Sequence, residues 1–197
     1  MKIIGLCGSS GSGKGYLSML FEKYEIPAID TDRLYRETTA KKGSACLDEL
    51  VSEFGDSIID ENGELYRKAL AEIVFGDGEK LKKLNEITHK HIKKDTLALV
   101  EKYRSEGMRA VIIDAPVLFE SGFDKLCDFT VCVTSPLEKK IERILTRDQI
   151  TREQAWARLA SQKSDSELIS LAKYQIDNSG KDLSLQIINI LKNENLI

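Results

Sequence analysis

Two observations in the sequence predict a three-layer α/β fold. In this fold, helices cover both faces of a parallel sheet of five strands. Short apolar segments alternate along the chain with segments of helical periodicity, which is typical of strands joined by helical crossovers. The first strand segment is also continuously apolar, as expected for a strand buried on both faces. The five expected strands are residues 2–7, 26–29, 109–114, 129–134 and 174–177.

Composition and length are those of an ordinary globular protein. The 197 residues are 42% hydrophobic and 31% charged, with a formal net charge of −3. This length suffices for one substantial core with inserted helical pieces. The sequence has no long basic run, so nucleic acid is not expected as a partner. No apolar stretch approaches the ~20 residues that span a bilayer, so we expect a cytoplasmic protein without a membrane partner. We also expect a monomer or weak homo-oligomer.

The first strand leads directly into a glycine-rich loop. Residues Gly8–Lys14 match GxxxxGK, and a helix is expected from about Lys14 to Tyr24. Strand, loop and helix in this order are the setting of a phosphate-binding loop, which predicts the P-loop NTPase fold. The backbone N–H groups and the helix N-terminus attract anionic oxygens, and the lysine bridges the β and γ phosphates of ATP. The expected ATP contacts are Gly8, Gly11, Ser12, Gly13, Lys14, Gly15 and Tyr16.

One position departs from the phosphate-loop motif. The residue after the lysine should be Ser or Thr, whose hydroxyl ligates Mg²⁺, but it is Gly15, followed by Tyr16. Mg²⁺ often keeps several waters, so water can occupy this ligand position. Asp114 ends the third strand, where an acidic residue would hold Mg²⁺ through water. We therefore expect Mg²⁺ to be used, but more weakly or slowly than with the hydroxyl present.

Two acidic residues, Asp30 and Asp32, lie just beyond the second strand. In an extended segment both would point toward the crevice at the carboxyl end of the strand. A carboxylate there can accept the proton of an attacking hydroxyl. The alternative is an Asx turn that caps the following helix.

A helix expected at about 137–147 carries two arginines on one face. Arg143 and Arg147 are four residues apart, so their side chains are neighbours. Close to the phosphate loop they would neutralise charge on a transferring phosphoryl group. The alternative is a solvated helix face. A last helix is expected at about 183–191.

Two stretches do not fit simple strand–helix spacing. Residues from about 33 to 106 are mostly helical and should form a lobe of their own. Residues from about 148 to 171 form a charged helical pair that could act as a mobile cover, or lid. The rest of the chain, residues 1–32, 107–147 and 172–197, would form the core. We expect one domain with an inserted lobe and a lid.

Motifs along nearly the whole chain, from residue 2 to about 190, resemble one family. They are the loop Gly8–Lys14, residues 29–32 with Arg36, 54–55, the turn at 62–63 with 67–70, then 73–75, 84–89, 114–122, Arg143, 147–148 and 176–180. In this combination the chain resembles the dephospho-coenzyme A kinases. The resemblance implies transfer of the γ-phosphoryl group of ATP to the ribose 3′-hydroxyl of dephospho-CoA, giving CoA and ADP.

The resemblance also implies roles for matching residues. Asp32 would be the base that receives the 3′-hydroxyl proton, and Lys14 and Arg143 would stabilise the moving phosphoryl group. Arg147 and Asn178 would lie on the ATP side. The residues implied on the acceptor side are Arg36, Arg67, His89, Leu118, Phe119 and Glu120. The helical lobe would bind CoA, and residues 148–171 would be the lid.

Two other functions stay open. One is a P-loop kinase for a nucleoside, a nucleotide or another small alcohol, which would not be expected to share residues 114–122 or the helix around His89. The other is a nucleotide-binding regulatory module whose magnesium site is impaired at Gly15. Intact Lys14, Asp32 and Arg143 argue against that module, because a degenerate site would be expected to lose them.

Overall fold

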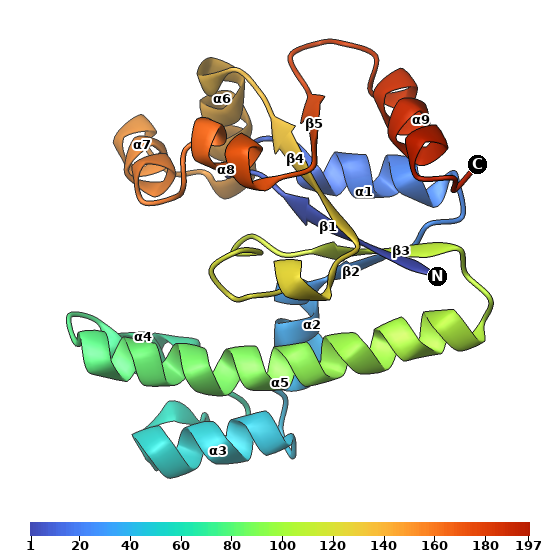
Figure 1. Ribbon diagram of the computed structural model, residues 1–197. Coiled ribbons are helices and arrows are strands. Elements are labelled where there is room, and N and C mark those ends of the chain that lie inside the picture. Colours follow the sequence, from blue (N-terminus) through green and yellow to red (C-terminus); the bar gives the residue numbers. More distant parts are fainter. The chain divides into compact units, whose positions relative to one another are not determined.

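The computed structural model describes residues 1–197 and contains a five-stranded parallel sheet in the order β2-β3-β1-β4-β5 (Figure 1). The α/β class and the five strands are as predicted. β1 is central and pairs in parallel with β3 and β4, while β4 pairs with β5. The strands are β1 (Lys2–Cys7), β2 (Ala28–Asp30), β3 (Ala110–Asp114), β4 (Phe129–Thr134) and β5 (Tyr174–Asp177).

Nine α-helices and three other helical turns accompany the strands. The α-helices are α1 (Lys14–Glu22), α2 (Thr31–Leu34), α3 (Ala45–Phe54), α4 (Arg67–Val74), α5 (Gly78–Ser105), α6 (Leu137–Asp148), α7 (Arg152–Ala160), α8 (Asp165–Leu171) and α9 (Leu183–Asn193). A π-helical turn spans Tyr35–Thr39, and 3₁₀ turns span Asp56–Ile58 and Asp124–Leu126. None of the helices combines the length and the apolar character that a membrane crossing requires.

The chain divides into two compact units. The sheet unit comprises Met1–Ile29 and Tyr103–Ile197, and the helical unit comprises Asp30–Lys102. In the sheet unit, α1 and α9 lie side by side on one face of the sheet (Figure 1). Leu17 and Phe21 of α1 and Ile187 of α9 are fully buried there. Burying each such side chain contributes about 1.5–3 kcal/mol, which fixes α1 against the strand that precedes the loop.

The segment that follows β3 closes the other face of the sheet. A Cβ on Gly5 would lie 2.9 Å from both Cys127 Sγ and a methyl group of Leu118, so this segment packs directly on β1. Leu168 of α8 is also buried, and α8 contacts β4. The charged helical pair expected at 148–171 is present as α7 and α8, each beginning with a capping box. Its role as a lid stays a prediction.

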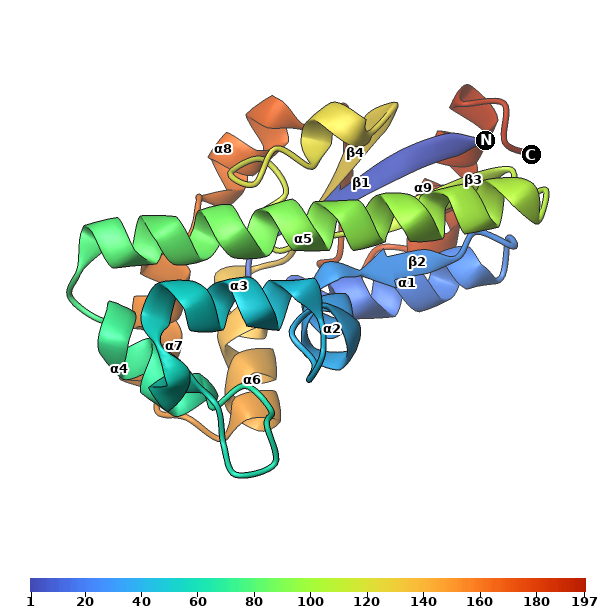
Figure 2. The same cartoon turned by 90° about the horizontal axis from the view of Figure 1, so that it is seen from below.

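The helical unit has a small core of its own. Leu50 of α3, Leu70 of α4 and Ile87 of α5 are buried together. Figure 2 shows α5 as one long helix with α3 alongside it. Lys90 Nζ of α5 forms an ion pair with Glu49 Oε2 of α3 at 2.6 Å. The acceptor-side residues expected in this part of the chain therefore sit on a separately packed helical frame.

Candidate active site

The loop between β1 and α1 has the backbone of a phosphate cradle. Gly11 and Gly13 have φ values of 75° and 102°, in the left-handed region that residues with side chains rarely adopt. A Cβ on Gly13 would also overlap the side-chain amide nitrogen of Asn178. Helix α1 begins at Lys14, so its first N–H groups add positive potential at the end of the loop. The predicted arrangement of strand, loop and helix is present.

Two side chains from other elements hold the carbonyl groups of this loop. Arg143 Nη1 of α6 donates to the carbonyl oxygens of Gly11 and Ser12, at 2.9 and 3.1 Å. Asn178 Nδ2, just after β5, donates to the same Ser12 oxygen at 2.9 Å. Because a trans peptide is planar, a carbonyl held on one side directs the next N–H, that of Gly13, to the other side. Both predicted residues therefore contact the loop and orient its amides.

Lys14 lies across the loop. Its Nζ donates to the carbonyl oxygen of Gly8 at 2.7 Å. A phosphate oxygen is a stronger partner than a neutral carbonyl, because the hydrogen bond is then charge-assisted on both sides. The ammonium group can thus exchange a bond within the loop for one to a bound anion.

Asp114 ends β3 as predicted, and it contacts a serine that the motif did not indicate. Ser18 Oγ lies 3.4 Å from Asp114 Oδ2 and 3.3 Å from the carbonyl oxygen of Lys14. Ser18 follows Gly15 by three residues, so both lie on one face of α1. A carboxylate and a hydroxyl are suitable ligands for Mg²⁺, and phosphate oxygens and waters would complete its coordination. The residues fit such an ion, although no cluster of three His, Cys, Asp or Glu side chains forms a metal cage.

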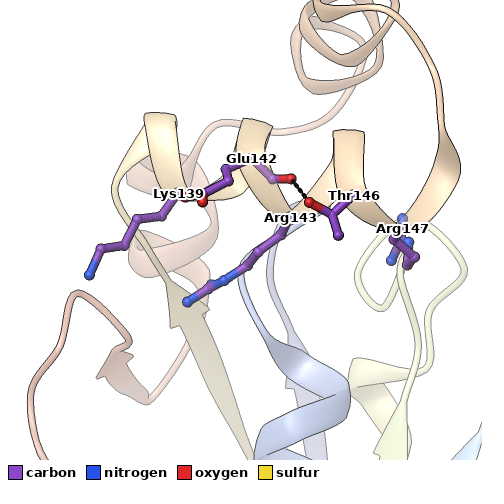
Figure 3. A pocket seen from close by; sticks show the side chains of 5 residues that line it. All are labelled: Lys139, Glu142, Arg143, Thr146 and Arg147. Carbon is purple, nitrogen blue, oxygen red and sulfur yellow. Dashed lines mark hydrogen bonds between the residues drawn. The ribbon is translucent and has the colours of Figure 1, made fainter.

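An open pocket of about 480 Å³ runs along one face of α6 (Figure 3). Its three cations against one carboxylate favour an anionic ligand. Lys139 Nζ donates to the carbonyl oxygen of Ser179 at 2.7 Å, next to Asn178. Arg147 pairs with Asp148, which raises the pKa of the guanidinium through their hydrogen bonds. The lining residues are Lys139, Glu142, Arg143, Thr146 and Arg147.

A second pocket, of about 430 Å³, adjoins the start of the phosphate loop. Gly8 and Ser9 line it together with residues after β3 and residues of the α7–α8 segment. Of the predicted acceptor residues, Glu120 lines this pocket and lies 3.6 Å from Lys163 Nζ. Phe119 is half-buried, whereas Leu118 is only 1% exposed and packs in the core. The predicted segment therefore contributes one polar side chain to the pocket.

The two acids after the second strand do not share an extended segment, so that part of the prediction is wrong. β2 ends at Asp30, and α2 begins at Thr31. Asp30 Oδ1 accepts the N–H of Arg33 at 2.9 Å and caps the helix, which is the alternative role considered above. Asp32 is exposed in the first turn of α2. Asp30 is therefore a helix cap, and Asp32 is the candidate base.

The other acceptor-side candidates lie in the helical unit. Arg36 is exposed in the π-helical turn. The Arg67 guanidinium lies over the Tyr35 ring, 5.2 Å from its centre. His89 is half-buried in α5, and burial lowers the pKa of its imidazole. Burial thus favours the neutral imidazole, which is suited to hydrogen bonding and not to charge neutralisation.

Comparison with known proteins identifies the family. The family model described as dephospho-CoA kinase matches residues 2–183. The chain belongs to the dephospho-CoA kinase family. The dephospho-CoA kinase of Bacillus cereus (strain ATCC 10987 / NRS 248) is 36% identical over 99% of this chain and 98% of its own length. The dephospho-CoA kinase of Listeria innocua is 39% identical over 90% of this chain and 88% of its own.

Solved structures agree with the fold. A crystal structure from Thermus thermophilus matches with a TM-score of 0.82 and 29% identity, over 98% of this chain and 97% of that one. A shikimate kinase from Acinetobacter baumannii, in complex with shikimate, matches with a TM-score of 0.52 over 100% and 96% of the two chains. At 19% identity the second likeness shows the fold alone. The dephospho-CoA kinase family member described here thus has the predicted P-loop kinase fold.

Proposed function

We propose that this chain is a dephospho-CoA kinase, which transfers the γ-phosphoryl group of ATP to the ribose 3′-hydroxyl of dephospho-CoA. The products are CoA and ADP, and the reaction is the final step of coenzyme A biosynthesis. The observation that carries the proposal is the family match over residues 2–183, which extends far beyond the phosphate loop. The phosphate loop, held by Arg143 and Asn178, supplies the site for the donor nucleotide.

The phosphate loop and the pocket on α6 form the ATP side of the proposed site. The triphosphate lies on the amides of the loop, with Lys14 on the β and γ phosphates. Arg143 bridges the loop and the pocket, so it neutralises charge as the phosphoryl group moves. Arg147 and Asn178 hold the rest of the nucleotide. The loop contacts are Gly8, Gly11, Ser12, Gly13, Lys14, Gly15 and Tyr16.

The proposed acceptor-side residues come from the helical unit and from the segment after β3. Asp32 accepts the proton of the 3′-hydroxyl as the oxygen attacks phosphorus in line with the leaving ADP. The exposure of Asp32 supports this role, because the carboxylate is accessible to a substrate. The helical unit, about residues 33–106, binds dephospho-CoA through Arg36, Arg67 and His89. Residues Leu118–Glu120 border the acceptor.

Positioning and charge neutralisation account for most of the proposed catalysis, because phosphoryl transfer requires little covalent help from the protein. Residues 148–171 act as the lid, and the closed lid excludes water from the γ-phosphoryl group. Both substrates are small and water-soluble. We place the enzyme in the cytoplasm as a monomer or weak homo-oligomer.

Mg²⁺ is the proposed metal cofactor. When bound, it neutralises phosphate charge and fixes the geometry of the triphosphate. Asp114 would hold it through water, and Ser18 orients that carboxylate from α1. Gly15 supplies no hydroxyl, so waters would complete the ligand set. This arrangement supports magnesium use at reduced affinity.

A panel of acceptors tests the function. Purified protein, ATP and Mg²⁺ are mixed separately with dephospho-CoA, adenosine, cytidine monophosphate and shikimate, and ADP release is followed. We expect acceptor-dependent ADP release with dephospho-CoA alone. Turnover only with another acceptor would support a different small-molecule kinase. ATP binding without turnover of any acceptor would support a regulatory module.

A further inference from the structure

The segment that joins α7 to α8, residues 161–164, makes direct hydrogen bonds to the phosphate loop. Gln162 Oε1 accepts the backbone N–H of Ser10 at 2.9 Å, and Gln162 Nε2 donates to Ser10 Oγ at 3.0 Å. One side-chain amide therefore satisfies both the main chain and the side chain of a single loop residue. Ser10 and Gln162 are 152 positions apart in the sequence.

Asp165, the first residue of α8, makes the adjoining contact. Its Oδ1 accepts from Ser9 Oγ at 3.0 Å, and its Oδ2 pairs with Lys140 Nζ at 2.6 Å. The Lys140 side chain is only 7% exposed, so its ammonium group depends on this partner. Lys140 belongs to α6, one turn before Arg143, which holds the next residues of the loop. The contact thus joins α8, α6 and the loop.

The hydroxyl groups of Ser9 and Ser10 take part in this contact, although the phosphate-loop motif requires no hydroxyl at either position. In GxxxxGK, Ser9 and Ser10 occupy unspecified positions. In this chain each hydroxyl bonds to the α7–α8 region. Gln162 and Ser9 also line the 430 Å³ pocket that adjoins Gly8. The contact therefore forms part of the wall around the start of the loop.

We propose that Gln162 and Asp165 form a latch that holds α7 and α8 against the loop and sets how long the nucleotide site stays closed. The inference rests on the proposed kinase function. While the latch is formed, the γ-phosphoryl group is transferred to the acceptor hydroxyl. When the latch opens early with ADP bound, ADP leaves sooner. When the latch opens early with ATP bound, water can attack the γ-phosphorus, giving ADP and inorganic phosphate. Gln162 and Asp165 are positioning residues in this scheme.

The test uses the full-length chain with Gln162→Met, Ser10→Ala and the double variant. Methionine keeps the volume of Gln162 and removes both hydrogen-bonding groups. Stopped-flow release of a fluorescent ADP analogue measures the dissociation rate without any acceptor. We expect Gln162→Met to raise this rate about fivefold to tenfold, as expected for the loss of one or two hydrogen bonds. Adding Ser10→Ala to Gln162→Met should then change the rate by less than about twofold, because the partner is already absent.

A second measurement compares phosphate release with CoA formation at saturating substrates. In Gln162→Met we expect a larger share of ATP to be hydrolysed, a raised KM for ATP and a kcat within about threefold of wild type. Ser170→Ala is the matched control, since Ser170 on α8 bonds only within its own helix, to Glu167, and should behave as wild type.

Two outcomes would overturn the latch: a dissociation rate unchanged in both single variants, or full additivity of their effects. Thermal unfolding of each variant separates loss of the latch from loss of the fold, and Ser10→Ala provides the milder change if Gln162→Met unfolds. The ADP release measurement requires no acceptor. A wild-type protein inactive on dephospho-CoA would therefore refute the proposed function while the dissociation rates still decide the latch.

Discussion

The phosphate loop and the helical unit show two different ways of presenting functional side chains. The loop is held by residues from α6, from the α7–α8 segment and from the end of β5, all more than 100 positions away. In the helical unit, Asp32 and Arg36 are exposed, and Arg67 rests on a neighbouring tyrosine. The nucleotide side is thus held in place by hydrogen bonds within the protein, whereas the side chains on the acceptor side are accessible.

This difference predicts how substitutions will divide between the two sides. Changes around the loop should alter nucleotide binding and often stability, because each side chain also supports the fold. Changes at exposed acceptor residues should alter transfer while the fold and nucleotide affinity remain. The following variants test that division, from the largest expected effect to the smallest.

Asp32→Asn should give the largest loss. Removing the proposed base should lower kcat by roughly 10²- to 10⁴-fold, while ATP affinity stays within about twofold. Steady-state kinetics and calorimetric ATP titration measure the two quantities. Asp30→Asn is the matched control, because asparagine caps a helix as well as aspartate does and should preserve α2 and activity. Equal activity of Asp32→Asn and wild type would exclude Asp32 as the base.

Arg143→Met should impair both nucleotide binding and transfer. The loop carbonyls of Gly11 and Ser12 lose a charged donor, and the moving phosphoryl group loses a cation. We expect kcat/KM for ATP to fall about 10²- to 10³-fold, with a lower unfolding midpoint. Arg152→Met removes an exposed ion pair with Glu138 and should leave both quantities nearly unchanged. A normal KM for ATP in Arg143→Met would show that the loop is organised without it.

Gly15→Thr should improve magnesium use. A Cβ at position 15 meets no atom within 4 Å, so a side chain can begin there without a clash. Its hydroxyl should lower the Mg²⁺ concentration for half-maximal turnover about threefold to tenfold, and calorimetry should show tighter ATP binding at limiting Mg²⁺. Gly15→Ala controls for the gain in helix stability and should not shift the Mg²⁺ dependence. No shift in Gly15→Thr would mean that Ser18 or water already fills that role.

Substitution of His89 should have the smallest effect, and the affected quantity is the pH dependence of the free energy of unfolding. Burial lowers the pKa of His89 in the folded state, so the unfolded chain binds its proton first as the pH falls below about 6.5. The contribution of His89 to the free energy of unfolding is therefore present above this pH and is lost below it. His89→Gln should reduce the fall in free energy of unfolding between pH 7.5 and 5.5, measured by urea denaturation. An unchanged fall would contradict the assigned burial effect.

Most of the fold was predictable, because its signals are local. The strands at 129–134 and 174–177 have the predicted bounds, since each is a short run between turn residues. The phosphate loop follows from its glycines and the flanking elements. Asp30 was harder, because the same residue suits both an extended strand end and a helix cap. Here the helix cap prevails, and α2 begins at the next residue.

The contacts around the loop could be predicted only in part. The spacing between Arg143 and Arg147 and the family resemblance both point to Arg143, and the resemblance alone points to Asn178. No spacing in the sequence connects Gln162 to Ser10. Ser18 had a local signal, since it lies one turn after the position where the motif's hydroxyl is missing. Side chains that meet across 96 or 152 positions depend on how the strands order themselves, which local patterns do not encode.

The central claim is tested most directly by identifying the product formed from ATP, Mg²⁺ and dephospho-CoA. Phosphorus NMR and mass spectrometry should show one added phosphate, present as a monoester on the ribose 3′-oxygen, in amounts equal to the ADP released. ADP accompanied by inorganic phosphate alone, with dephospho-CoA recovered unchanged, would contradict the claim.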